Sequence, residues 1–356
     1  MSDRAARDES RAATVSDYTE HELIARIQRR LAPPPDWLVV GIGDDAAVVE
    51  PERNRMEVVT VDAVVDGVHF DRAFVPPDAI GHRALAVNLS DLAAMGASPR
   101  FALLSLMLPG ELPLDDFDGL AAGCVALART HRLHLVGGNL TRTRGPLTVD
   151  LTAAGTVKRR QVLTRGGARP GDELYLTGSI GSARAGLEIL RDDRANENRS
   201  DWSKTAVERY LYPQPRVRAG MLLGRNRVAS ACVDLSDGLA DAAHRIAESS
   251  GVGIEVDEAT VPIEADVRRW FAERSEDPVL SAATGGDDYE LLVAVRPRGR
   301  RQLTAVIRQA GVPFTRVGVC TASPDQVTIG GRPMPPGYGH FRPVGRFRVP
   351  SDGGGR

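Results

Sequence analysis

The sequence predicts a mixed α/β protein of two domains. The chain has 356 residues, which is more than one hydrophobic core usually spans. Short apolar runs typical of strands alternate with longer segments of helical periodicity. A segment rich in Gly and Pro, LTRGGARPGDELYLTG at 163–178, separates two groups of these elements. We expect an N-terminal domain at 19–160 and a C-terminal α/β domain at 161–345, with a disordered lead-in at 1–18 and a flexible tail at 346–356.

The N-terminal domain is expected to begin with a short helix. Thr19 and Glu22 form a capping-box pattern, apolar residues follow at helical spacing, and three prolines at 33–35 stop the helix. The pattern then predicts strands at 38–42, 46–49 and 57–62, helices at about 79–96 and 115–132, and strands near 133–136 and 147–157.

The C-terminal domain is expected to begin at the strand ELYLT. Strand-turn-helix units follow along the chain, and neither domain shows an internal repeat. The units are ELYLTGSIGSARAGLEIL, ACVDLSDGLADAAHRIA, and DYELLVAV with the helix after it.

The composition is that of a soluble globular protein, with 42% hydrophobic and 26% charged residues. The longest apolar stretch, near FALLSLML, is too short to cross a bilayer. A net charge of −2 gives no general attraction to nucleic acid, so neither a membrane nor a nucleic acid partner is expected. The N-terminus has no apolar signal segment, which favours a cytoplasmic protein. Cys124, Cys232 and Cys320 form no CxxC pair and are expected to be buried.

Aspartates recur at the ends of the expected elements. The segment VGIGDDAAVV places Asp44 and Asp45 on a tight turn between two apolar runs. One Asp in a turn serves the local backbone, but a pair of like charges calls for a cation. Most of the recurring residues stand beside Gly, Ser or Thr, which suits turns near a ligand. They are Asp44, Asp45, Asp62, Asp91, Asp234, Asp237, Asp287 and Asp288.

Asp91 lies in an unusually apolar helical segment, ALAVNLSDLAAMG. A helix this apolar is buried, and a buried carboxylate needs a cation or hydrogen bonds. No Lys or Arg lies within one turn, and Asn88 shares its helix face. Asp91 is therefore either a structural cap or a metal ligand. Several carboxylates without His or Cys clusters suit Mg²⁺, and Mg²⁺ with phosphates indicates phosphoryl transfer.

The common nucleotide and nucleophile motifs are absent. The chain has no GxxxxGK[ST], GxGxxG, GxSxG or HExxH, so covalent catalysis has no candidate residue. Two Gly-containing segments, Gly137-Gly138 and 178–181, are either phosphate cradles or ordinary turns.

The ordered motifs GIGDDAAVV, TVDAVVDGVHF, ALAVNLSDLAAMGASP, VGGNLTR, LTRGGARPGD, VDLSDGLADA and GGDDYEL resemble the thiamine-monophosphate kinase family. The resemblance covers about residues 20–341. It implies a homodimer whose N-terminal domains pair through their sheets into a barrel-like interface, with each C-terminal domain alongside. It also implies Mg²⁺-dependent transfer of the ATP γ-phosphate to thiamine monophosphate, giving thiamine diphosphate and ADP. The acceptor phosphate is already nucleophilic, so no general base and no covalent enzyme intermediate are expected.

The resemblance also assigns site residues. Positions that match metal ligands of the family are Asp45, Thr60, Val61, Asp62, Asp91, Asp234 and Asp237, with Val61 offering only its carbonyl oxygen. The ATP-contacting positions are Gly138, Asn139, Arg165 and Ser236, and the amide oxygen of Asn139 is a further metal ligand. The substrate-contacting positions are His69 and Asp287, with Tyr338 the ring nearest to the thiamine. Without the resemblance, the alternative interpretations are a satisfied, partly buried histidine for His69 and a linker salt bridge for Arg165.

Three departures from the family pattern affect the pocket. Relatives carry Asp at the position of Asn139, Glu at Asp287, and an aromatic residue at Pro335. A related ATP enzyme with another acceptor is one alternative, such as a selenophosphate synthetase, but it would need a reactive Cys or Sec near the N-terminus, and no Cys precedes Cys124. A non-catalytic ATP-binding homologue is the other alternative.

Overall fold

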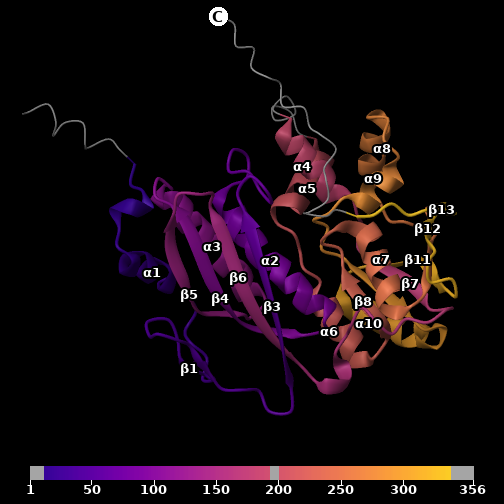
Figure 1. The fold of residues 1–356 in the computed structure, drawn as a ribbon, viewed down its shortest axis with the longest axis horizontal. Coiled ribbons are helices and arrows are strands. Elements are labelled where there is room, and N and C mark those ends of the chain that lie inside the picture. The colour runs from indigo at the N-terminus through magenta and orange to yellow at the C-terminus, as the bar shows by residue number, and fades with distance from the viewer. Residues whose placement is uncertain (1–11, 193–199, 338–356) are drawn as a thin grey trace, which may run out of the picture.

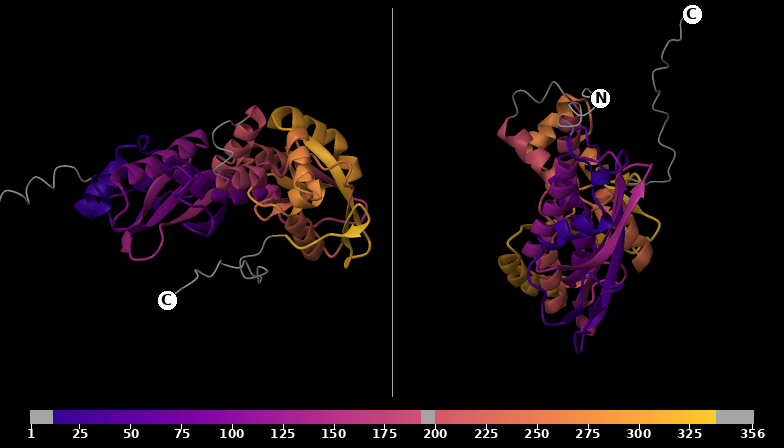
Figure 2. Two further views of the ribbon diagram at one scale, coloured as in Figure 1. Left: turned by 90° about the horizontal axis from the view of Figure 1, so that it is seen from above. Right: turned by 90° about the vertical axis from the view of Figure 1, so that its left-hand side faces the viewer.

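The computed structural model describes residues 12–192 and 200–337. Figure 1 and Figure 2 show two groups of elements side by side, one from each half of the chain. Each group contains a sheet packed against helices, so the predicted mixed α/β fold is confirmed. In the ranges described, no helix is both long and apolar enough to cross a bilayer.

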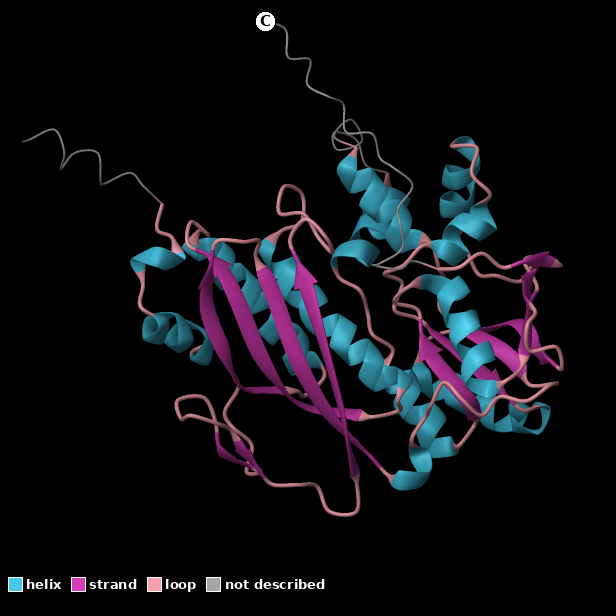
Figure 3. Cartoon of the chain, in the orientation of Figure 1, coloured by secondary structure: helices cyan, strands magenta, loops and turns pink. Residues whose placement is uncertain are grey.

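The N-terminal half builds a four-stranded sheet in the order β3-β6-β4-β5. Strands β4 and β5 are parallel, and the other neighbours are antiparallel. Helices α2 and α3 cover one face (Figure 3). The elements are η1 (Val15–Asp17), α1 (Glu20–Gln28), β1 (Leu38–Val40), β2 (Val48–Val49), β3 (Met56–Val65), α2 (Pro77–Ala94), β4 (Ser98–Pro109), α3 (Leu114–Thr130), β5 (His134–Thr143) and β6 (Thr148–Val157).

The other face of this sheet is not covered by a helix of the described chain. Alternate residues of a strand point to opposite faces. In β3, Val64 is buried on the helix side, whereas Val59 and Val61 are exposed on the opposite side. Leu103 of β4 is exposed beside them, because Val61 and Leu103 both pair with Thr152. We call this surface the open face, defined by Val59, Val61 and Leu103.

Helices α2 and α3 pack with their backbones in close approach. A Cβ on Gly81 would lie 1.9 Å from the Leu120 carbonyl oxygen, and one on Gly123 would lie 1.9 Å from that of Asp78. Only glycine permits these distances, so Gly81 and Gly123 allow α2 to pack closely against α3. Helix α1 begins as predicted, with the Thr19 and Glu22 capping box in place.

The C-terminal half builds a seven-stranded sheet in the order β13-β12-β9-β11-β7-β10-β8. Strand β12 runs parallel to β9, and the other neighbours of this described sheet are antiparallel. The elements are η2 (Arg159–Gln161), β7 (Glu173–Thr177), α4 (Ser182–Arg191), α5 (Asp201–Leu211), α6 (Val217–Asn226), β8 (Ala229–Asp234), α7 (Gly238–Ser250), β9 (Gly253–Val256), α8 (Ala265–Glu273), α9 (Pro278–Thr284), β10 (Leu291–Val295), η4 (Pro297–Gly299), α10 (Arg300–Ala310), β11 (Phe314–Thr321), β12 (Val327–Ile329) and β13 (Arg332–Pro333).

Helix α2 connects the two halves. It lies under the first sheet and also contacts α6 and β8 of the second half. A Cβ on Gly220 of α6 would lie 1.9 Å from the Ala93 carbonyl oxygen of α2. The two halves therefore pack backbone against backbone at the end of α2.

Some expectations from the sequence need correction. The lead-in was expected to be disordered to residue 18, but residues 12–18 are folded, because Val15 is buried and its N–H donates to the Leu112 oxygen at 2.9 Å. No strand is expected from the sequence at 98–109, where β4 forms an inner strand of the sheet. The boundary expected at 160/161 stays a prediction, and the tail at 346–356 lies outside the described residues. The three cysteines are buried as predicted.

Candidate functional site

Aspartates from three elements meet where α2 passes between the two sheets. Asp62 comes from β3, Asp91 from α2, and Asp234 from the end of β8. The Thr60 hydroxyl of β3 donates to an oxygen of Asp91. The Ser90 hydroxyl donates to Asp234 Oδ2 at 2.7 Å. Neighbouring residues of α2 thus join a strand of the first sheet to a strand of the second.

The charges in this group repel one another. Burial, and then the Asp91 carboxylate, raise the pKa of Asp62 to about 7, and Asp234 and Asp150 add to the rise. Burial and Asp91 likewise raise the pKa of Asp234 to about 7, with Asp237 adding to the effect. The Ser90 hydrogen bond and the Arg165 charge act in the opposite direction. We call Asp62, Asp91, Asp234 and Asp237 the acidic cluster.

The donor atoms of the acidic cluster suit Mg²⁺. They are hard carboxylate oxygens supported by hydroxyl groups, without a thiolate or an imidazole among them. In residues 12–192 and 200–337, however, no three His, Cys, Asp or Glu side chains are grouped closely enough to hold a metal ion as they stand. The donor set fits Mg²⁺ in its chemistry.

The structure brings together five of the residues expected to bind metal, and it leaves Asn139 and Asp45 apart from them. Asn139 lies on β5, three strands from Asp62 of β3, a separation of about 14 Å at the usual strand spacing. Its amide donates to Thr141 Oγ1 at 2.8 Å. Asp45 is exposed in its turn, where its N–H donates to Asp44 Oδ1 at 2.8 Å. Val61 lies on β3 between Thr60 and Asp62; its side chain is on the open face, and the expected role of its carbonyl oxygen stays a prediction. The five that meet are Thr60, Asp62, Asp91, Asp234 and Asp237.

Two of the expected ATP contacts lie beside the acidic cluster. Arg165, in the segment that connects β6 to β7, is close enough to Asp234 for its charge to oppose the rise in the pKa of that carboxyl. Ser236 is exposed in the turn between β8 and α7, and its carbonyl oxygen accepts the Asp287 N–H at 2.9 Å. Gly138 lies on β5 with Asn139, away from this group.

The two candidate phosphate cradles do not form open turns. Gly137 and Gly138 lie inside β5, where a Cβ on Gly138 would come within 1.8 Å of the Leu104 oxygen. At the start of α4, the Gly181 N–H donates to both oxygens of Asp288 at 3.1 Å. The chain's own carboxylate therefore occupies that helix terminus.

The expected substrate contacts, His69 and Asp287, are connected through Tyr210 and Arg83. His69 Nδ1 accepts the Val65 N–H at 3.1 Å, and its carbonyl oxygen accepts the Tyr210 hydroxyl at 3.4 Å. Asp287 accepts Arg83 Nη2 at 2.8 Å and the Tyr289 hydroxyl at 2.9 Å. Tyr338 lies outside the described residues.

Four residues at the site did not emerge from the sequence: Arg83, Ser90, Tyr210 and Tyr289. Ser90 had a signal, because it precedes Asp91 in an apolar helix where a hydroxyl needs a partner. No sequence signal marked Arg83, since its partner Asp287 is 204 positions away. Asn88, three positions before Asp91 on α2, shares its helix face by spacing, and its amide donates to the Ala84 oxygen at 3.0 Å.

Comparison with known families agrees with this geometry. The family model described as AIR synthase related protein, N-terminal domain, matches residues 43–157, and the model for the C-terminal domain matches residues 169–330. Fold and site together define a two-domain protein of the AIR synthase-related class.

Individual relatives narrow the assignment. Thiamine-monophosphate kinase of Salmonella typhimurium is 36% identical over 90% of this chain and 98% of its own. The crystal structure of the Stenotrophomonas maltophilia thiamine-monophosphate kinase matches with a TM-score of 0.79 and 37% identity, over 88% of this chain and 98% of that one. The structure of AaThiL complexed with AMPPCP and TMP matches with a TM-score of 0.73 and 28% identity, over 93% and 100%. This chain belongs to the thiamine-monophosphate kinase family.

Proposed function

We propose that this chain transfers the γ-phosphoryl group of ATP to thiamine monophosphate, giving thiamine diphosphate and ADP. The observation that carries the proposal is the meeting of Asp62, Asp91 and Asp234, from both halves of the chain, at the end of α2. Membership of the kinase family supports the reaction. The complex of AaThiL with AMPPCP and TMP supports a nucleotide and a thiamine phosphate as the two ligands.

The residues present suit phosphoryl transfer without a general base. The acceptor is a phosphate that is already anionic near neutral pH, so no side chain has to remove a proton. The acidic cluster would hold Mg²⁺, which would neutralise charge on the phosphates and align donor with acceptor. Arg165 offers a permanent positive charge next to Asp234. His69 and Asp287 would orient the acceptor substrate, and transfer would be direct and in line.

The full set of proposed ligands extends beyond the acidic cluster. We assign metal binding to Asp45, Thr60, Val61, Asp62, Asp91, Asn139, Asp234 and Asp237, and ATP binding to Gly138, Asn139, Arg165 and Ser236. Because Asn139 and Asp62 lie at opposite edges of one sheet, a single ion would not bind both within one chain. A second binding position is therefore part of the proposal.

A homodimer formed through the open face is also proposed. Val59, Val61 and Leu103 are 64%, 59% and 39% exposed, which makes an aliphatic patch on one face of the sheet. Asp150 lies on the same face, beside Ala63 and Ser105, and its Oδ1 is buried with no hydrogen-bond partner in the described chain. A second copy covering this face would bury the aliphatic side chains and give a barrel-like pair of sheets. A cytoplasmic location stays a prediction.

The direct test is incubation of the pure protein with ATP, Mg²⁺ and thiamine monophosphate. We expect thiamine diphosphate and ADP in equal amounts, and no product without Mg²⁺. ADP release with other phosphate acceptors but not with this one would identify a related enzyme. Calorimetric ATP binding with no product from any thiamine phosphate would support a non-catalytic protein, the alternative that the departures at Asn139 and Pro335 favour.

A further inference from the structure

We propose that Arg83 is a positioning residue for the acceptor substrate. It holds Asp287 by one carboxylate oxygen and leaves the other oxygen to accept an N–H of the substrate. The inference rests on the proposed function, because it concerns how the same site recognises thiamine monophosphate.

The hydrogen bonds of Asp287 are unevenly distributed over its two oxygens. Oδ1 accepts both Arg83 Nη2, at 2.8 Å, and the Tyr289 hydroxyl, at 2.9 Å. Oδ2 has no hydrogen-bond partner among the described residues, and the side chain is 30% exposed. A carboxylate oxygen can accept two hydrogen bonds, so Oδ2 remains available to a ligand.

The backbone around Asp287 is held in an uncommon conformation. Asp287 has a φ of 66° and Tyr289 a φ of 49°, a region that residues with a side chain seldom adopt. Such strain persists where surrounding contacts hold it, and it is concentrated at functional sites. Arg83 supplies one of these contacts from a rigid helix, α2.

Arg83 itself is firmly fixed. Its side chain is 3% exposed, and its guanidinium lies over the Tyr210 ring, 4.3 Å from the ring centre. Nη1 donates to the backbone carbonyl oxygen of Tyr210. Tyr210 in turn donates its hydroxyl to the His69 carbonyl oxygen at 3.4 Å. Arg83 therefore contacts Asp287 directly and His69 through Tyr210, the two residues expected to orient the acceptor.

The charge of Arg83 determines which group of the substrate can bind to Oδ2 of Asp287. A carboxylate without a partner would attract the positive thiazolium ring. Arg83 balances the negative charge of Asp287, so Oδ2 is left as a directed hydrogen-bond acceptor rather than a counter-ion. Such an acceptor suits the amino group of the aminopyrimidine ring, and a site built for an N–H donor rejects analogues that lack it.

The experiment compares thiamine monophosphate with its analogue that has a carbonyl oxygen in place of the amino group. We expect the wild type to prefer thiamine monophosphate by at least about tenfold in kcat/KM. Arg83→Met should raise the KM for thiamine monophosphate by about tenfold and remove most of that preference, with the KM for ATP within about twofold. Arg83→Lys, which keeps the charge but not the fork, should lie between the two. Arg26→Met, which removes an arginine paired with Asp118, is the matched control and should behave as wild type.

Three outcomes would overturn the inference: an unchanged preference in Arg83→Met, an equal rise in the KM for ATP, or a fall in kcat alone. If Arg83→Met does not fold, Tyr289→Phe removes the other donor to Oδ1 and should reduce the preference in the same direction. A wild type that makes no thiamine diphosphate contradicts the proposed function instead. Calorimetric binding of the two compounds to wild type and Arg83→Met then decides the inference, and equal affinities in the wild type would refute it.

Discussion

Asp91 is the residue on which the site depends most, because it lies between the two halves of the chain. Thr60 donates to it, and its charge raises the pKa of both Asp62 and Asp234. We predict that Asp91→Asn lowers the rate of thiamine diphosphate formation by at least about 100-fold, since it removes one metal-binding charge with little change in volume. Its melting temperature should stay equal or rise, because repulsion is relieved. Steady-state rates and circular dichroism check this, with Asp266→Asn, at a surface ion pair, as the control. A wild-type rate would contradict the metal role.

The raised pKa values of Asp62 and Asp234 predict how stability depends on pH. Each carboxyl binds its proton more tightly in the fold than in the unfolded chain, so its contribution to stability is full at low pH and is lost as pH rises through about 7. The metal-free protein should therefore lose stability from about pH 4 up to about pH 7, the interval between the unfolded and folded pKa values. Mg²⁺ competes with these protons, so its stabilising effect should grow over the same range.

Melting temperatures with and without Mg²⁺, measured across that pH range, test the prediction. Asp234→Asn should weaken both the pH dependence and the effect of Mg²⁺. If Mg²⁺ raises the melting temperature equally at both ends of the range, the acidic cluster is not where it binds.

At the residue scale the sequence predicted the acidic side chains better than their partners. Carboxylates in apolar or Gly-rich surroundings stand out in one sequence, because burial of a charge needs an explanation. Asp62, Asp91 and Asp234 were found in this way and do meet. Arg83 and Tyr289 leave no such signal, since a long amphipathic side chain is compatible with many positions until its distant partner is known.

At the scale of elements, regular amphipathic patterns were predicted well and the inner strand was not. Helix α2 was expected at about 79–96 and spans Pro77–Ala94. Strand β4 was missed because an apolar run of this length is compatible with a buried helix or strand. Hydrogen-bonded pairing with β5 and β6 makes this segment a strand, and pairing between strands is not visible in a single sequence.

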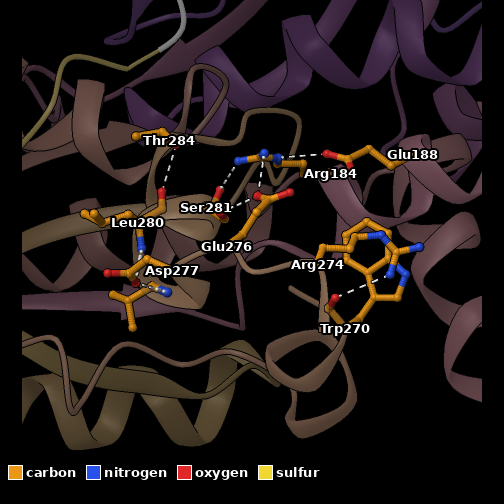
Figure 4. Close-up of polar contacts among 10 residues, drawn as sticks. Arg184, Glu188, Trp270, Arg274, Glu276, Asp277, Leu280, Ser281 and Thr284 are labelled. Atoms are coloured by element: carbon orange, nitrogen blue, oxygen red, sulfur yellow. Dashed lines mark hydrogen bonds and ion pairs between the residues drawn. The ribbon is translucent and has the colours of Figure 1, made fainter. Parts of the chain in front are cut away.

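Arg184 of α4 forms a hydrogen bond with helix α9, as Figure 4 shows. The guanidinium donates to the Ser281 oxygen at 2.9 Å and to Glu276 Oε2 at 2.9 Å. The Ser281 oxygen also accepts the N–H of Gly285, which leads to Asp287. The segment that carries Asp287, a proposed substrate contact, therefore directly follows a helix that Arg184 holds in place.

We predict that Arg184→Met lowers the free energy of unfolding by about 1–2 kcal/mol, because these partners are only partly exposed. It should also speed hydrogen exchange in residues 278–287. Arg274→Met is the control, since Arg274 stacks on Trp270 at 3.8 Å and makes no hydrogen bond or ion pair with α9 in the described chain (Figure 4). Equal exchange in both variants would mean that α9 is held by other contacts.

At the scale of the whole molecule, α2 makes the two halves one unit. It carries Arg83 to Asp287, Ser90 to Asp234, and Ala93 to Gly220. A composition shift at 163–178 predicted that two groups of elements exist, but it holds no information on how they pack. That packing brings the acidic cluster together, so the site belongs to neither half alone.

The open face gives the last prediction, on oligomeric state. Leu103 lies on β4, inside the four-stranded sheet, and is 39% exposed. If two chains pair through this face, Leu103→Glu places a charge in the middle of an apolar contact and should raise the dimer dissociation constant by at least about tenfold. Light scattering after gel filtration over a range of concentrations measures this. Met221→Glu is the matched control, because Met221 is 37% exposed but lies on α6 in the other half. A dimer that resists Leu103→Glu, or a wild type that is monomeric at every concentration, would show that the open face is not the contact between chains.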